Sequence, residues 1–159
     1  MLFVCEDNRW SATTATGAMT AGPGAAARSE AIGVPARAVD GNDVEAVADA
    51  AAALADEVRA GAGPRLLHAR TYRVKGHVSV DPAPYRDAAE VRAALADDPI
   101  ERAVATWLAL GGQAAQVDAL RAAAQAEVDA AVAAAEAAPP PEADAAFADV
   151  QDLGAGRWT

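Results

Sequence analysis

The sequence contains little cysteine, few aromatic residues and less basic than acidic charge. Its one cysteine, Cys5, cannot form an internal disulfide, which fits a reducing, cytoplasmic compartment. Aromatic residues make up 4% of the chain, and much of the 53% hydrophobic content is alanine. We therefore expect a core of small side chains and long alanine-rich helices. The net charge of −10 argues against nucleic acid, whose recognition needs a basic face, and against anionic lipid.

Long apolar runs are absent as well. No run reaches the about 18 residues that a membrane span needs, and no basic region followed by an apolar stretch marks a signal peptide. The 159 residues have room for one domain with a helical appendage. Met1 leads directly into the apolar run Leu2–Cys5. This leaves two interpretations open: an ordinary start with an edge strand, or the later part of a larger domain.

Strand-like and helix-like segments alternate in the first part of the chain, and only helices follow. The run Leu2–Cys5 is apolar throughout, which predicts a strand buried on both faces. A loop is expected over residues 6–24. The other predicted elements are, in order, a helix at 25–32, a strand at 36–39, a helix at 44–60, a strand at 65–72, and helices at 87–95, from 99 onward and at 113–138.

This alternation predicts where a functional site should lie. Alternating strands and helices indicate a parallel sheet with right-handed crossovers, hence the α/β class. A polar cluster follows each predicted strand: Asn8 the first, Asp40–Asp43 the second and His77 the third. Ligands of such sheets bind beyond the carboxyl ends of the strands. We therefore expect the three clusters to meet at one edge of the sheet.

Five segments, in this order and spacing, carry a resemblance to a known family. They are Val4–Asn8, Val39–Val44, Thr71–His77, Asp81–Arg86 and Asp98–Arg102. On these segments the chain resembles the carboxyl-terminal half of the alpha subunit of the thiamine-diphosphate-dependent 2-oxo acid dehydrogenases. That group includes the pyruvate, branched-chain 2-oxo acid and acetoin enzymes, and the short gap from His77 to Tyr85 is most similar to the acetoin branch.

The resemblance implies a partial thiamine-diphosphate-binding fold. Residues 1–86 would form the second half of the α/β domain, with a short parallel sheet flanked by helices. Residues 87–159 would form a helical, subunit-packing region and tail.

A cofactor site is implied too. Asn8 would bind Mg²⁺ through its side-chain oxygen and Trp10 through its backbone carbonyl, and such oxygen donors suit this ion. Glu6 and His77 would lie at the thiamine diphosphate. Asp7 stands where relatives usually have Asn, and it would add a negative charge near the diphosphate.

By the same resemblance, His77 is the active-site histidine that assists transfer of the acyl group to a lipoyl arm. An imidazole suits this step because it takes up and releases a proton near neutral pH. Four residues would order the loop for docking the lipoyl domain of a dihydrolipoyl acyltransferase: Arg73, Asp81, Tyr85 and Arg86. His68, within the third strand, is interpreted as structural.

In this family the cofactor lies between the alpha and beta subunits of a heterotetramer, and a beta-subunit glutamate activates it. The Gly-Asp-Gly that begins the family's cofactor signature, and supplies a further Mg²⁺ ligand, does not occur in this sequence. We therefore expect the chain by itself to be inactive. Three accounts stay open: a piece of a full alpha subunit, one half of a split subunit, or a remnant kept for binding partners.

The leading hypothesis is part of an enzyme that decarboxylates a 2-oxo acid, or cleaves acetoin, and passes the acyl group to lipoamide. One alternative is a non-catalytic assembly module, in which the helices from residue 87 onward hold subunits together. Another is an acidic, helical partner-binding protein with a small α/β head.

Overall fold

A computed structural model describes residues 1–78 and 80–147 of the chain. The chain divides into two compact units, Met1–Gly112 and Gln113–Thr159, and each is considered by itself. The functional division that we expect after residue 86 separates the sheet from the helices that follow it, and it stays a prediction.

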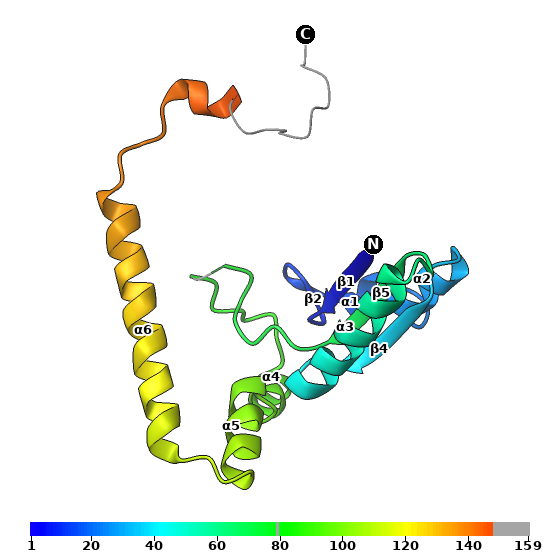
Figure 1. The fold of residues 1–159 in the computed structure, drawn as a ribbon, viewed down its shortest axis with the longest axis horizontal. Coiled ribbons are helices and arrows are strands. Elements are labelled where there is room, and N and C mark those ends of the chain that lie inside the picture. Colours follow the sequence, from blue (N-terminus) through cyan, green and yellow to red (C-terminus); the bar gives the residue numbers. More distant parts are fainter. Residues whose placement is uncertain (79, 148–159) are drawn as a thin grey trace. The chain divides into compact units, whose positions relative to one another are not determined.

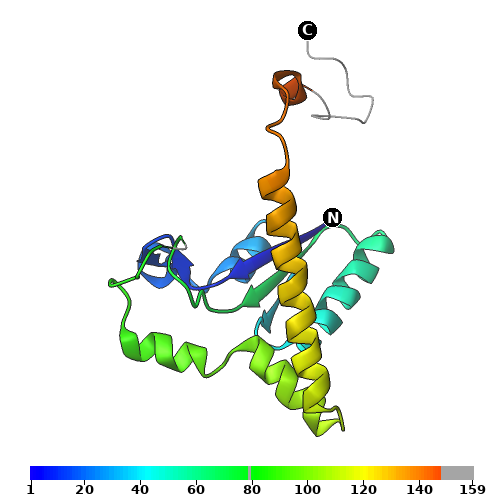
Figure 2. The same ribbon diagram turned by 90° about the vertical axis from the view of Figure 1, so that its left-hand side faces the viewer.

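Three parallel strands form the centre of the first unit (Figure 1). β5 (Arg65–Arg70) lies between β1 (Leu2–Asp7) and β4 (Ala36–Asp40), and both neighbours run parallel to it. Figure 2 shows the three arrows side by side. The predicted α/β class, with a short parallel sheet and crossover helices, is confirmed.

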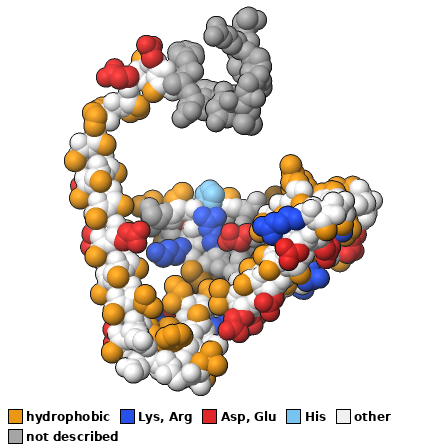
Figure 3. All heavy atoms as spheres, in the orientation of Figure 1, with side chains coloured by type: hydrophobic (Ala, Val, Ile, Leu, Met, Phe, Trp, Pro, Cys, Tyr) orange, Lys and Arg blue, Asp and Glu red, His pale blue; other side chains and the backbone are white. Residues whose placement is uncertain are grey.

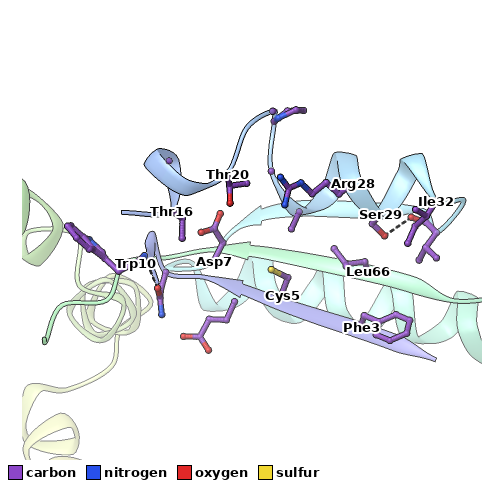
Figure 4. Close-up of a pocket in the computed structure, with 18 residues that line it drawn as sticks. Phe3, Cys5, Asp7, Trp10, Thr16, Thr20, Arg28, Ser29, Ile32 and Leu66 are labelled. Carbon is purple, nitrogen blue, oxygen red and sulfur yellow. Dashed lines mark hydrogen bonds between the residues drawn. The ribbon is translucent and has the colours of Figure 1, made fainter. Parts of the chain in front are cut away.

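Helices pack on both faces of the sheet, mainly over β4 and β5. α3 (Val44–Arg59) places Ala50 and Leu54 against Leu67 of β5, and these three buried side chains form the core. α2 (Ala25–Ala31) also contacts β4 and β5, and Figure 4 shows the two helices on opposite sides of the strands. The core is small: only four partly buried hydrophobic residues pack against it in the described chain, Leu2, Val39, Val47 and Ala51.

The prediction that Leu2–Cys5 is buried on both faces is wrong. Phe3 is 45% exposed and Val4 is 65% exposed. In the described part of the chain β1 pairs only with β5, so it is an edge strand, and the helices cover its neighbours more than β1 itself. An apolar run indicates a strand but carries no information about which other elements cover it.

The prediction of a loop over residues 6–24 is wrong in part. β2 (Trp10–Ser11) and β3 (Thr14–Ala15) form a small antiparallel hairpin, and α1 (Thr16–Met19) follows it. The hairpin turns through Ala12, whose φ of 52° is uncommon for a residue with a side chain. Elements of two to four residues are too short for hydrophobic periodicity to reveal.

Two capped helices complete the first unit. α4 (Ala88–Leu95) and α5 (Pro99–Ala109) begin close to where the sequence predicts. The carboxylates of Asp87 and Asp98 accept hydrogen bonds from the first free N–H groups of their helices. Pro99 stands at the first helical position, where its missing N–H costs nothing.

Two helices form the regular structure of the described part of the second unit, residues 113–147. α6 (Ala114–Ala137) agrees with the predicted helix at 113–138, and the short 3₁₀-helix η1 (Ala143–Phe147) follows. No side chain of α6 is buried. Phe147 and Val150, which we expect to anchor the tail, lie outside the residues whose side chains the structure describes. Across residues 1–78 and 80–147, no helix is both long and apolar enough to cross a bilayer.

Candidate functional site at the carboxyl ends of β1 and β5

The segments that leave β1 and β5 stay paired beyond the sheet. The Thr71 N–H donates to the Asp7 carbonyl at 2.9 Å, and the Arg73 N–H donates to the Asn8 carbonyl at 3.0 Å. Because the two strands are parallel neighbours, the turn with Asn8 and the loop with His77 both start at the same edge of the sheet. This is the edge at which α/β proteins bind ligands.

A tight turn after β1 brings two oxygen donors together. The Asn8 side-chain oxygen accepts a hydrogen bond from the Trp10 N–H at 3.0 Å, and Asp7 Oδ1 accepts one from the Arg9 N–H at 3.3 Å. Arg9 has a φ of 70°, a left-handed conformation that costs a non-glycine residue free energy. The turn therefore holds the Asn8 amide oxygen beside the Trp10 backbone.

The Asn8 side-chain oxygen and the Trp10 carbonyl oxygen are of the ligand type that suits Mg²⁺. Mg²⁺ prefers oxygen ligands and keeps several waters or phosphate oxygens in its coordination sphere. Among the described residues no group of three or more His, Cys, Asp or Glu side chains could hold a metal. The Asn8 amide and the Trp10 carbonyl are neutral, so a metal here would need anionic ligands from a phosphate group to balance its charge.

A cavity of about 920 Å³ adjoins this turn (Figure 4). Glu6, Asn8 and Trp10 line it, together with residues of α1, α2 and the connection between them. In the close-up, Asp7 points toward Thr16 and Thr20, and Arg28 extends from α2. Of the predicted cofactor residues, Glu6, Asn8 and Trp10 thus share one cavity, whereas His77 is not among its lining residues.

Asp7 is paired with a residue that the sequence analysis interprets only as structural. Its Oδ2 lies 3.0 Å from Nε2 of His68 on β5. The hydrogen bond from His68 and, to a lesser degree, the N–H of Arg9 lower the pKa of Asp7, against the opposing effect of burial. The sequence does not reveal this contact, because the two residues are far apart along the chain and meet only through the strand register.

The loop after β5 is held by hydrogen bonds around His77. The His77 N–H donates to Asp81 Oδ2 at 2.8 Å, and the His77 carbonyl accepts from Arg73 Nη2 at 2.5 Å. Arg73 Nη1 lies 3.4 Å from His77 Nδ1. Because the guanidinium can only donate, Nδ1 is the acceptor in this contact. The His77 side chain is exposed, and Figure 3 shows an imidazole at the surface beside basic and acidic side chains.

Asp81 connects the two sides of this loop. The Tyr85 hydroxyl donates to Asp81 Oδ2 at 2.5 Å, and this bond, followed by the backbone N–H groups of His77 and Ala83, lowers the pKa of Asp81. A side chain at Gly76 would collide with the Asp81 backbone and side chain. Glycine before His77 is therefore a packing requirement of the closed loop.

Arg86 joins the loop to the turn after β1. It is 8% exposed, and its Cζ lies 4.6 Å from the Trp10 ring centroid, with the rings of Tyr72 and Tyr85 at 5.8 and 5.9 Å. Its Nη1 donates to the Arg73 carbonyl. The structure thus brings together all four predicted loop residues, Arg73, Asp81, Tyr85 and Arg86. The Trp10–Arg86 contact has no local sequence signal.

Four buried donors of this aromatic cluster have no well-aligned hydrogen-bond partner among the described residues. They are Trp10 Nε1, Arg86 Nε and Nη2, and the Tyr72 hydroxyl, all buried. Burial raises the pKa of Tyr72, and the nearby Glu90 carboxylate adds to this. The guanidinium is therefore held mainly by aromatic faces and one carbonyl.

The cluster expected after the second strand, Asp40–Asp43, makes contacts within the protein. Asn42 is 8% exposed; it accepts from the Thr71 hydroxyl at 2.6 Å and donates to Asp97. Arg102 of α5 lies 2.8 Å from Asp40 and also contacts Asp43 and Asp97. This cluster ties the helices after the loop to the carboxyl edge of the sheet.

Comparison with known proteins identifies the family to which this site belongs. Residues 1–144 match the family described as Dehydrogenase E1 component. The chain is a member of that family. It is 33% identical over 151 residues to the pyruvate dehydrogenase E1 component subunit alpha of Zymomonas mobilis, covering 94% of this chain and 43% of that protein.

Two other dehydrogenase alpha subunits each match 64% of the chain. The pyruvate dehydrogenase E1 component subunit alpha of Porphyra purpurea is 38% identical over 102 residues, 64% of this chain and 30% of that protein. The 3-methyl-2-oxobutanoate dehydrogenase subunit alpha of Mycobacterium tuberculosis is 38% identical over 102 residues, 64% of this chain and 28% of that protein. The chain spans less than half the length of these relatives. The predicted resemblance is confirmed.

Proposed function

We propose that this chain forms part of the alpha subunit of a thiamine-diphosphate-dependent 2-oxo acid dehydrogenase. The proposal rests on the hydrogen bond between the segments that follow β1 and β5. The Arg73 N–H donates to the Asn8 carbonyl at 3.0 Å, and this bond joins the turn that contains Asn8 to the loop that contains His77. The relatives named for pyruvate and 3-methyl-2-oxobutanoate support a 2-oxo acid as substrate. Acetoin is the other substrate that the loop length suggests.

In this proposal the turn after β1 holds part of the cofactor site. Asn8 and Trp10 would each give one oxygen to Mg²⁺, and Glu6 would line the same cavity. When bound, thiamine diphosphate supplies the carbanion chemistry that decarboxylation needs. The residues of this chain bind and orient it. The donors are neutral, so the diphosphate itself would provide the negative charge that the metal requires.

His77 would serve the transfer of the acyl group to a lipoyl arm. Arg73 lies against its Nδ1, which leaves Nε2 as the ring nitrogen that can contact a reacting atom. The hydrogen bonds to Asp81 and from Arg73 fix the backbone on both sides of the imidazole. This ordered loop would dock the lipoyl domain of a dihydrolipoyl acyltransferase, and a beta subunit would complete a heterotetramer.

A second candidate function is subunit assembly without catalysis. The exposed apolar residues of the segment from residue 99 onward favour it, because Ile100 is 63%, Trp107 46% and Leu110 76% exposed. Such residues on a helix often mark contacts with a partner. Both functions could belong to one chain, and the experiment below separates them.

The proposal is tested with this chain combined with a beta subunit and the region of an alpha subunit that carries Gly-Asp-Gly. Replacing His77→Ala should impair acyl transfer to lipoamide more than decarboxylation, and Asn8→Ala should weaken Mg²⁺-dependent binding of thiamine diphosphate in calorimetry. Val78→Ala, next to His77 and 53% exposed, is the matched control and should change neither. Assembly with no Mg²⁺-dependent cofactor binding would leave the assembly function as the one supported.

A further inference from the structure

The buried imidazole of His68 has no part in the function proposed above. It lies on the central strand β5 and is 3% exposed. Its Nε2 is 3.0 Å from Asp7 Oδ2. Asp7 is the last residue of β1, and the next residue is Asn8, the proposed oxygen donor. The pair therefore connects the centre of the sheet to the turn that would hold the metal.

The proton in this contact can be assigned. Asp7 Oδ1 accepts from the Arg9 N–H, and Oδ2 faces the imidazole, so both carboxylate oxygens act as acceptors. With both carboxylate oxygens accepting, Nε2 of His68 is the ring nitrogen that carries a proton and donates it to Oδ2 at 3.0 Å.

Both ends of the pair are constrained by the fold. In the strand register Cys5 lies opposite His68, and Asp7 is the diagonal neighbour on the same face. The loop before α2 passes over the ring, since a side chain at Gly24 would lie 3.4 Å from the His68 Cε1. The imidazole thus has a fixed place between the sheet and this loop.

Other contacts restrain the backbone of the turn, such as the bond from the Thr16 N–H to the Arg9 carbonyl at 2.9 Å, but they leave the side chain of Asp7 unheld. In the described chain β1 has a strand partner on one side only, and Arg9 adopts a left-handed conformation that disfavours the turn. The backbone bonds from Thr71 and Arg73 fix the carbonyls of Asp7 and Asn8. They do not fix the side chain of Asp7. This side chain accepts a hydrogen bond from the Arg9 N–H and thereby stabilises the turn.

We propose that Asp7 and His68 form a positioning pair, which holds the turn after β1 so that the Asn8 side-chain oxygen and the Trp10 carbonyl face a ligand together. The pair also keeps the Asp7 carboxylate bound to the imidazole, away from the metal ligands. The part that concerns the metal rests on the function proposed above; the part that concerns the geometry of the turn does not.

The experiment compares three variants of the chain. His68→Leu fills the same space without a donor, and His68→Gln places an amide N–H near the position of Nε2. Arg65→Gln is the matched control, because Arg65 begins the same strand and pairs with Glu57 at 2.5 Å at the far end of the sheet. All three are measured without ligand by amide hydrogen exchange.

In His68→Leu we expect the Trp10 and Arg73 amides to exchange about tenfold faster, as loss of one supporting hydrogen bond implies. His68→Gln should restore protection to within about threefold of the wild type. Arg65→Gln should leave both amides unchanged. If His68→Leu leaves them unchanged, or if Arg65→Gln accelerates them equally, the positioning role is overturned.

A second readout uses Mn²⁺ with thiamine diphosphate as the probe. His68→Leu should weaken Mn²⁺ binding about tenfold, and His68→Gln should recover most of it. Equal affinity in all variants would overturn the role in metal binding. If the wild-type chain, combined with a beta subunit and the alpha-subunit region that carries Gly-Asp-Gly, binds no Mn²⁺, the proposed cofactor function fails, and the exchange measurement still decides the positioning role.

Discussion

Replacing Arg86 should release the loop that carries His77 while the rest of the unit stays folded. Arg86 is 8% exposed and lies 4.6 Å from the Trp10 ring centroid. Its Nη1 donates to the Arg73 carbonyl, and the Arg73 guanidinium donates to the His77 carbonyl. Arg86→Met keeps a long side chain in the aromatic cluster and removes both the charge and the donor.

The size of the effect follows from these contacts. The variant loses a cation–π contact worth about 1–2 kcal/mol and a hydrogen bond from a charged donor worth about 1.5–3 kcal/mol. Two changes offset part of this loss. The variant no longer buries a cation with two unpaired donors, and it gains a sulfur–aromatic contact of about 0.3–1.5 kcal/mol. A net loss of about 2 kcal/mol would raise the population of the open loop roughly 30-fold.

Amide hydrogen exchange of the His77 N–H, which donates to Asp81, measures that population directly. Arg92→Met is the control, because Arg92 is an exposed arginine on the adjacent helix α4. The reasoning is refuted if Arg86→Met exchanges within about twofold of the wild type, or more slowly, because the buried guanidinium would then cost as much as it contributes. It is also refuted if Arg92→Met has the same effect.

Three further predictions follow from the contacts described above. Leu67→Ala, in the small core, should lower the free energy of unfolding by about 2–5 kcal/mol in urea denaturation, and a loss below about 1 kcal/mol would contradict the core assignment. Because the pKa of Asp7 is lowered on folding, its contribution to stability is present above the unfolded value near pH 4 and is lost as the pH falls through the folded pKa. Asp7→Asn should therefore flatten the acid limb of the stability curve, and an unchanged limb would count against the pair. Tyr85→Phe, which removes the donor to Asp81, should speed limited proteolysis of the loop without changing the melting temperature; equal cleavage rates would argue that the loop is ordered by other contacts.

Periodicity and turn chemistry were sufficient to predict most elements of the first unit. α3 and α5 are bounded by capping acids, Asp43 and Asp98, and by glycines after their ends, so local signals mark them. The parallel arrangement followed from the alternation of strands and helices. The burial of β1 could not be predicted, because it depends on which elements lie beside a strand, and an apolar run is compatible with an edge or a centre.

The sequence predicts which segments form the candidate site. It does not predict the side-chain contacts between those segments. Asn8 and His77 each follow a strand, so topology alone places them at one edge of the sheet. The Asp7–His68 and Trp10–Arg86 contacts join residues more than 60 positions apart along the chain. They depend on strand register and on the path of a loop, and no spacing rule within one segment encodes them.

Paramagnetic relaxation by bound Mn²⁺ is the most direct test of the claim that the oxygen-donor turn and the His77 loop form one site. The chain, combined with a beta subunit and the region of an alpha subunit that carries Gly-Asp-Gly, is titrated with thiamine diphosphate and Mn²⁺, which takes oxygen ligands as Mg²⁺ does. The signals of Trp10, His77 and Gly63 are followed by NMR. Gly63 precedes β5 and lies at the opposite end of the strand, roughly 20 Å away at 3.3 Å per residue. We predict that Trp10 and His77 broaden together, that Gly63 stays sharp, and that Asn8→Ala abolishes the effect. Broadening of Trp10 with a sharp His77 signal, or no broadening at either residue, would contradict the account.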